Sequence, residues 1–207
     1  MMTETNIKNE RAVSRLDTEE RILITARELF IEKGFSGVSG DALCKAARVS
    51  KTSLYKYFGD MSGVLIAVVS REGDLFELNV DTRPSSEDAF WKELTGYGTR
   101  LLQLLNTPFC IQLDRTMHEE ARRNPDLAKR FYDNAYGRGH DDITALLQHG
   151  LDEGFLAHPA SASDLSDHLI SMWEGLRFIR TRLGVDEVPF EDPEAWSAHC
   201  VNTLFRR

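Results

Sequence analysis

The segment KTSLYKYF, residues 51–58, carries side chains whose types and spacing suit contacts with DNA. Amines pair with guanine acceptors in the major groove, and hydroxyls reach base edges or phosphates. Three apolar positions, Val49, Leu54 and Phe58, are spaced to pack one side of a helix inward. The side chains left for an external partner are Lys51, Thr52, Ser53, Tyr55, Lys56 and Tyr57. The pattern predicts a helix that enters the major groove of double-stranded DNA.

The residues before this segment predict a partner helix. Ser39 and Ser50 are good N-caps, so one helix would run from about Ser39 to Ala47 and the next would begin after Ser50. Small or apolar side chains stand where a helix-turn-helix needs buried contacts: Leu43, Cys44, Ala47, Val49 and Leu54. The two helices would therefore form a helix-turn-helix.

Individual roles follow from side-chain chemistry. Lys51, Thr52 and Ser53 open the second helix and are placed for base edges, with Lys51 suited to guanine N7 and O6. Tyr55, Lys56 and Tyr57 are placed for the sugar-phosphate backbone, although Tyr57 could instead pack against the next helix. Ser39 could reach a phosphate or act only as a cap. An arm containing Lys8, Arg11 and Arg15 could reach the minor groove or be an ordinary disordered tail.

Composition excludes several classes of protein. The 207 residues carry a net charge of −8, but residues 1–60 hold ten Lys or Arg against nine Asp or Glu, so the acidity lies in the later part. The three cysteines are far apart, which favours a reducing compartment over a disulfide scaffold. Histidine spacing indicates no metal site, and no cofactor motif is present. The polar start and the short apolar runs predict a cytoplasmic protein without a membrane span.

The remainder of the chain indicates an all-α fold. Asp17 or Thr18 would cap a first helix that ends at Gly34. A fourth helix would start after Asp60 and reach about Leu78. Later helix starts are marked by a capping residue, three times followed by proline: Ser85 or Ser86, Thr107-Pro108, Asn124-Pro125 and Asp192-Pro193. Gly137 and Gly139 would kink or split a long helix over residues 125–153.

An apolar stripe near the C-terminus has heptad spacing. Its members are Leu165, Leu169, Met172, Leu176, Ile179 and Leu183, and the last helix adds Trp196, Cys200 and Leu204 at steps of four. One interpretation is a core within the chain. The other is a dimer interface, in which two helices of each subunit form a four-helix bundle. Periodicity alone does not decide between them.

Two stretches, ERILITARELFIEKGFSGVS and ALCKAARVSKTSLYKYFGD, resemble the N-terminal domain of the TetR family of transcription regulators. EEARRNPDLAKRFY and GLDEGFL resemble, more weakly, the AefR-like type of C-terminal domain. The resemblance implies a flexible arm over residues 1–17, a DNA-binding domain over 18–64 and a ligand-binding and dimerisation domain over 65–207. It also implies about nine helices per subunit and a homodimer on a palindromic operator, released by a small molecule. Dimerisation through the last two helices, which the resemblance also implies, favours the dimer interpretation of the heptad stripe.

The resemblance places DNA contacts on nine residues: Ser39, Arg48, Ser50, Lys51, Thr52, Ser53, Tyr55, Lys56 and Tyr57. Two positions depart from the family. Arg48 replaces the usual turn glycine, and this replacement would destabilise the fold by roughly 1 kcal/mol if the left-handed geometry is kept. Met61 replaces the usual lysine at the start of the fourth helix, which would remove about one phosphate contact.

The effector pocket implied by the resemblance would be lined by larger side chains of the middle helices. The candidates are Trp91, Tyr97, Phe109, Cys110, Met117, His118, Phe131, Tyr136, His140 and Trp173. Such positions are more often plain core. His118 and His140 could orient a polar group, and Cys110 could act as a redox switch.

The favoured function is a ligand-responsive repressor. Arg48, Met61 and the acidic total motivate an alternative, a ligand-binding or protein-interaction module with weakened or lost DNA binding. An all-helical enzyme is a third possibility, but no nucleophile–base pair, metal spacing or phosphate loop supports it.

Overall fold

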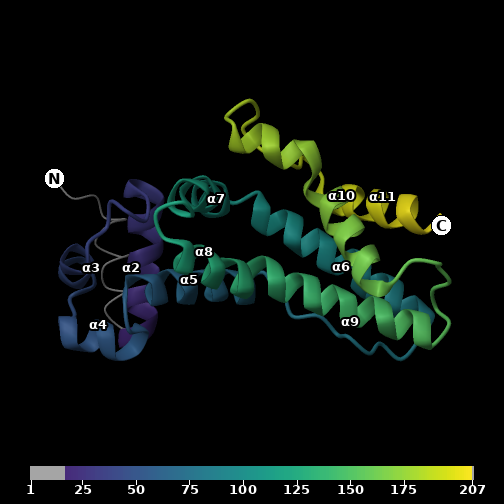
Figure 1. Ribbon diagram of the computed structural model, residues 1–207, viewed down its shortest axis with the longest axis horizontal. Helices are drawn as coiled ribbons and strands as arrows, with labels where there is room; N and C mark the ends of the chain where they lie inside the picture. The colour runs from purple at the N-terminus through teal and green to yellow at the C-terminus, as the bar shows by residue number, and fades with distance from the viewer. Residues whose placement is uncertain (1–16, 207) are drawn as a thin grey trace, which may run out of the picture. The chain divides into compact units, whose positions relative to one another are not determined.

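Helices make up all the regular secondary structure in the part of the chain that the structure, a computed structural model, describes, residues 17–206 (Figure 1). The elements are α2 (Thr18–Lys33), α3 (Gly40–Ala47), α4 (Lys51–Phe58), α5 (Met61–Leu75), α6 (Glu87–Leu105), α7 (Pro108–Glu120), α8 (Pro125–Tyr132), one turn of π-helix, η1 (Asp133–Gly137), α9 (Arg138–Asp152), α10 (Ala162–Arg182) and α11 (Pro193–Phe205). Because α8, η1 and α9 are continuous, they count as one long helix, which gives nine helices within residues 17–206, in agreement with the expected number. Between residues 17 and 206, no helix is long and apolar enough to cross a membrane.

The chain divides into two compact units. The first ends at Val69 and the second begins at Ser70, so the division falls within α5. The family resemblance implied a boundary between residues 64 and 65. Helix α5 ends at Leu75, whereas the sequence predicts an end near Leu78. The predicted arm over residues 1–17, with Lys8, Arg11 and Arg15, lies outside the described residues except for Asp17.

Side-chain caps explain where the helices of the first unit begin. Asp17 accepts a hydrogen bond from the Glu20 N–H at the start of α2, and α2 ends at Gly34. Ser39 caps α3 and Ser50 caps α4, as predicted. The core of this unit contains Ile22, Ala26, Phe30, Val38, Leu43, Ala47, Leu54, Val64, Leu65 and Val68. The unit is therefore a small helical domain held together by apolar packing.

The helix starts of the second unit follow the predicted pattern. Ser86, Thr107, Asn124 and Asp192 each accept a backbone N–H, and proline follows the last three caps. Ser161 caps α10 in the same way. These side chains satisfy N–H groups that would otherwise lack partners in the first turn.

The core of the second unit is built around α6. This helix packs against α11 and α9, and α10 packs against α9 and α11. Trp173 of α10 is fully buried and approaches Gly98 of α6 so closely that a Cβ at Gly98 would collide with the indole and with Ser197. Glycine at position 98 is therefore required for this close packing.

Two irregular turns interrupt the long helices of the second unit. The predicted kink near Gly137 is the π-turn η1, which precedes α9. α10 bends at Gly175, whose φ of 49° and ψ of −161° are not helical (Figure 1). One turn before the bend, Trp196 and Cys200 of α11 donate to the carbonyls of Trp173 and Met172. The two side chains stabilise the interrupted backbone.

Candidate nucleic-acid interface and ligand site

The exposed side of α4 carries the predicted DNA-contacting side chains. Leu54 is fully buried and anchors α4 to the first unit. Of the nine predicted residues, Ser53 is half-buried, and the other eight are exposed: Ser39, Arg48, Ser50, Lys51, Thr52, Tyr55, Lys56 and Tyr57. The helix thus presents amines, hydroxyls and phenols on one surface, opposite its buried leucine.

The serines of this surface are already used within the protein. Ser39 Oγ accepts the Ala42 N–H at 3.2 Å, and Ser50 Oγ accepts the Ser53 N–H at 3.0 Å. The hydroxyls of Ser50 and Ser53 also lie 2.9 Å apart. Capping is therefore the role that the geometry gives to Ser39 and Ser50, and a phosphate contact would be additional.

Arg48 adopts the left-handed conformation in the turn between α3 and α4. Its φ is 55° and its ψ is 49°, and its N–H donates to the Cys44 carbonyl. The turn geometry that usually requires glycine is thus kept with arginine in place.

Replacing Arg48 by glycine is expected to raise the free energy of unfolding by about 1 kcal/mol, because glycine has no Cβ to strain the left-handed backbone. Urea denaturation measures the change. Ala46→Gly is the control, since a glycine inside helical α3 should lower stability by about 1 kcal/mol. A destabilised Arg48→Gly variant would show that the arginine side chain makes a compensating contact.

The hydroxyl of Tyr55 lies against the start of α3. A Cβ at Gly40 would stand 2.5 Å from that oxygen and 3.8 Å from the sulfur of Met61. Tyr57 is half-exposed, and its ring packs against Phe58 with centroids 6.0 Å apart. Gly40 therefore lets the Tyr55 ring lie across the N-terminal end of α3, close to the first residue of α5.

Sequence reasoning missed the charged neighbour of Lys51. The ammonium of Lys51 lies 2.6 Å from a carboxylate oxygen of Asp41 in the first turn of α3. The hydrogen bond to Asp41 and its negative charge raise the pKa of Lys51. The charge signs could have suggested the pair, but a separation of ten residues follows no single-helix spacing.

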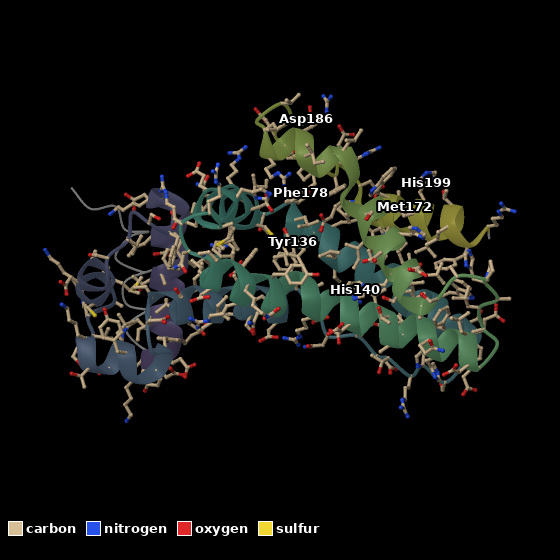
Figure 2. All side chains as sticks on the ribbon, viewed as in Figure 1. Tyr136, His140, Met172, Phe178, Asp186 and His199 are labelled. Carbon is tan, nitrogen blue, oxygen red and sulfur yellow. The ribbon has the colours of Figure 1, made fainter. Side chains whose placement is uncertain are left out.

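A second polar cluster lies in the second unit and is called here the Asp114 network: Asp114, His118, Tyr136 and Arg182. The Tyr136 hydroxyl donates to Asp114 Oδ1 at 3.0 Å, and Arg182 donates to Asp114 Oδ2 at 3.1 Å. His118 Nδ1 lies 3.5 Å from Asp114 Oδ2. Because Asp114 is buried, its carboxylate requires hydrogen-bond or charged partners. These partners lie on η1 and α10, so Asp114 of α7 joins three elements. Figure 2 labels Tyr136, on η1, and Phe178 of α10.

Two acidic groups beside this network have raised pKa values. Burial, followed by the charge of Asp114, raises the pKa of Glu174 to about 7, although Arg182 acts in the opposite direction. Burial also raises the pKa of the Cys110 thiol to about 12, and the charges of Asp114 and Glu174 add to this effect. A thiol with so high a pKa forms little thiolate, which argues against the redox switch.

Glu174 is expected to make stability depend on pH. The pKa of Glu174 in the folded protein, about 7, lies above the ordinary value of 4.5. Between these pH values the folded state binds more protons than the unfolded state, so the contribution of Glu174 to the free energy of unfolding declines as pH rises from 4.5 through 7. In the Glu174→Gln variant, the fall in the free energy of unfolding over this pH range should be smaller by up to about 3 kcal/mol. Urea denaturation from pH 4.5 to 8 measures it, with the exposed Glu153→Gln as control. Parallel pH profiles for wild type and Glu174→Gln would contradict the expectation.

The other predicted ligand residues are dispersed. Trp91 donates to Glu87 and packs against Phe205, while Trp173 belongs to the main core. His140 Nε2 lies 3.3 Å from a carboxylate oxygen of Asp167 in α10. Tyr97, Phe109, Met117 and Phe131 are buried, and the ring of Phe131 packs against that of Tyr136, with centroids 5.8 Å apart. The polar centre at Asp114 was missed because its two hydrogen-bond donors, Tyr136 and Arg182, are 22 and 68 residues away in the sequence.

The predicted dimer stripe divides at the bend of α10, which corrects the expectation of one regular helix. Before the bend, Leu165 and Leu169 are fully buried in their own subunit, as is Cys200 of α11. Beyond it, Leu176 is 75% exposed and Leu183 is 74% exposed, with Ile179 also exposed. Met172, Trp196 and Leu204 are half-buried. The exposed apolar surface is therefore confined to Leu176, Ile179 and Leu183 of the stripe.

A buried helix-turn-helix core with an exposed polar helix, followed by a larger helical unit, defines a helical DNA-binding regulator. Comparison with known families agrees. Residues 22–68 match bacterial regulatory proteins of the tetR family, and residues 92–207 match the C-terminal domain of AefR-like transcriptional repressors. The chain belongs to the TetR family of bacterial transcription regulators.

Individual relatives support the fold over different lengths. The HTH-type transcriptional regulator UidR of Escherichia coli K12 is 36% identical over 55 residues, which span 27% of this chain and 28% of UidR. A TetR transcriptional regulator from Agrobacterium tumefaciens has a TM-score of 0.75 at 21% identity, covering 92% of this chain and 94% of that one. The regulator FadR from Bacillus subtilis, in complex with stearoyl-CoA, has a TM-score of 0.68 at 15% identity, with coverages of 90% and 97%.

Within residues 17–206, no group of His, Cys, Asp or Glu side chains is arranged to hold a metal ion.

Proposed function

We propose that this protein is a homodimeric, cytoplasmic repressor that binds a palindromic operator through α3 and α4. Binding of a small molecule to the second unit releases the DNA. The observation that carries the proposal is the division of α4 into a buried anchor, Leu54, and an exposed surface that includes Lys51, Tyr55 and Lys56. A short helix with this division can present its polar side to the major groove while its fold stays intact.

The contacts fall into two groups in this proposal. Lys51 and Thr52 lie in the first turn of α4 and face base edges, whereas Tyr55, Lys56 and Tyr57 hold the sugar-phosphate backbone. Arg48 and the capped starts of α3 and α4 add phosphate contacts. The backbone contacts fix the register, and the first turn of α4 supplies sequence preference.

The effector would bind near the Asp114 network. The network joins three elements of the second unit, and Phe131 and Tyr136 place aromatic rings beside it with centroids 5.8 Å apart. Aromatic surface next to a few fixed polar groups is typical of small-molecule sites. The structure of FadR with stearoyl-CoA is a related fold with a bound small molecule, which supports the proposal without identifying this protein's effector.

Dimerisation is assigned to the exposed apolar side chains beyond the bend of α10. Leu176, Ile179 and Leu183 would pack against the same residues of a second copy, since a two-fold interface uses one surface twice. Half-buried Trp196 and Leu204 of α11 would extend the interface. Two reading helices on one dimer match the two halves of a palindrome.

The experiment that tests this function is fluorescence anisotropy of the purified protein with DNA flanking its own gene, compared with random duplex over a salt series. The proposal predicts saturable binding that is tighter than to random duplex and weakens with salt. Compounds that lower the anisotropy would then be candidate effectors. No preference for this DNA or for any genomic fragment would favour the alternative module that has lost DNA binding.

A further inference from the structure

The ion pair between Lys51 and Asp41 lies on the predicted DNA-binding surface. Lys51 is the first residue of α4, and Asp41 is in the first turn of α3, so the pair joins the starts of the two helices. The two charged atoms are 2.6 Å apart, and the side chains are 59% and 70% exposed, respectively. The pair is accessible to a DNA duplex that approaches α4.

So exposed a pair contributes little to folding stability. The ion pair instead restricts the position of the Lys51 ammonium group. A lysine side chain has a flexible stem of four carbons and an ammonium group with three N–H donors. Asp41 accepts a hydrogen bond from one of those donors. Two donors remain for an external acceptor, while the terminal nitrogen is held near the start of α4.

A carboxylate at this place also affects which DNA atoms Lys51 reaches. Binding to random DNA depends almost entirely on neutralising phosphates. Asp41 partly neutralises Lys51 and repels a phosphate that would compete for it. A guanine edge is an uncharged acceptor and meets less repulsion, so the pair weakens phosphate contacts more than base contacts.

The geometry points to Asp41 as a positioning residue that holds Lys51 for base edges and thereby raises the discrimination between operator and random DNA. The inference rests on the proposed function, because it requires that α4 binds DNA. Asp41 itself need not touch the duplex. Its role is to restrict where the Lys51 ammonium lies.

The test uses the full-length protein and two duplexes: one recovered by wild-type protein from a randomised library, and one of random sequence. Asp41→Asn should bind the random duplex several-fold more tightly, with a salt slope steeper by about one released ion, because Lys51 becomes free to contact phosphate. The ratio of operator to random affinity should fall by about tenfold. Asp41→Glu keeps the carboxylate and should restore most of that ratio.

Two controls separate positioning from a general change of charge. Glu28→Gln removes an exposed carboxylate of α2 and should leave the ratio unchanged. In a Lys51→Gln background, Asp41→Asn should no longer lower the ratio, since the lysine it positions is absent. The inference is overturned if Asp41→Asn leaves the ratio at its wild-type value, or lowers it equally without Lys51. Failure of the proposed function would appear instead in wild-type protein, as absence of any recovered sequence.

Discussion

Replacement of Tyr55 by alanine is expected to lower operator affinity by about tenfold to a hundredfold while the protein stays folded and dimeric. The hydroxyl lies across the start of α3, beside Gly40, so one side chain links both helices of the DNA-binding surface. The substitution removes a contact with the DNA sugar-phosphate backbone. It also removes the ring that positions α4 against α3. Fluorescence anisotropy measures affinity, and sedimentation velocity checks the dimer.

Tyr132→Ala is the matched control for this prediction. Tyr132 is an exposed tyrosine of the second unit, so its replacement should leave operator affinity unchanged. If Tyr55→Ala bound the operator as tightly as wild type, the DNA-binding surface would lie elsewhere in the protein. A loss of affinity accompanied by unfolding would be recognised from circular dichroism.

The paired substitutions Leu176→Glu and Leu183→Glu are expected to convert the dimer into monomers at low micromolar concentration. Both side chains are largely exposed within the subunit, so charges there should not disturb its core. In a two-fold interface each glutamate would lie in buried apolar surface near its own copy, which strongly disfavours association. Sedimentation velocity measures the change, and affinity for a palindromic operator should fall with it.

Leu75→Glu places the same charge on another exposed leucine and should leave the dimer intact. Leu169 is unsuitable for this experiment because it is fully buried, and a charge there would unfold the subunit. Dimers that persist in the Leu176→Glu, Leu183→Glu protein would place the interface away from α10 beyond its bend.

Local signals made the first unit predictable from sequence. The caps at Ser39 and Ser50, the stop at Gly34 and the buried positions Leu43 and Leu54 are each determined by neighbours within a few residues. Helix capping and apolar spacing act over that range, so the helix-turn-helix followed directly. The family resemblance left open whether Arg48 keeps the left-handed turn geometry of the usual glycine, and the structure shows that it does, with a φ of 55°.

The features that sequence did not predict depend on contacts between distant residues. Asp114 gains its partners only when α7, η1 and α10 meet, and Lys51 meets Asp41 only across the turn. The bend at Gly175 was hidden because the apolar stripe keeps its spacing through the glycine. Whether such a stripe faces the core or a second subunit depends on which helices cover it, and spacing carries no information on that point.

The most direct test of the central claim, that α3 and α4 form the DNA interface, is hydrogen–deuterium exchange of the dimer with and without operator DNA. Slower exchange on DNA binding is expected in peptides covering residues 39–58, chiefly at the first turn of α4, whose N–H groups have no backbone acceptor within the helix. Exchange in peptides that cover α11 should not change, because α11 does not contact DNA in this proposal. Unchanged exchange over residues 39–58, with protection elsewhere, would contradict the account.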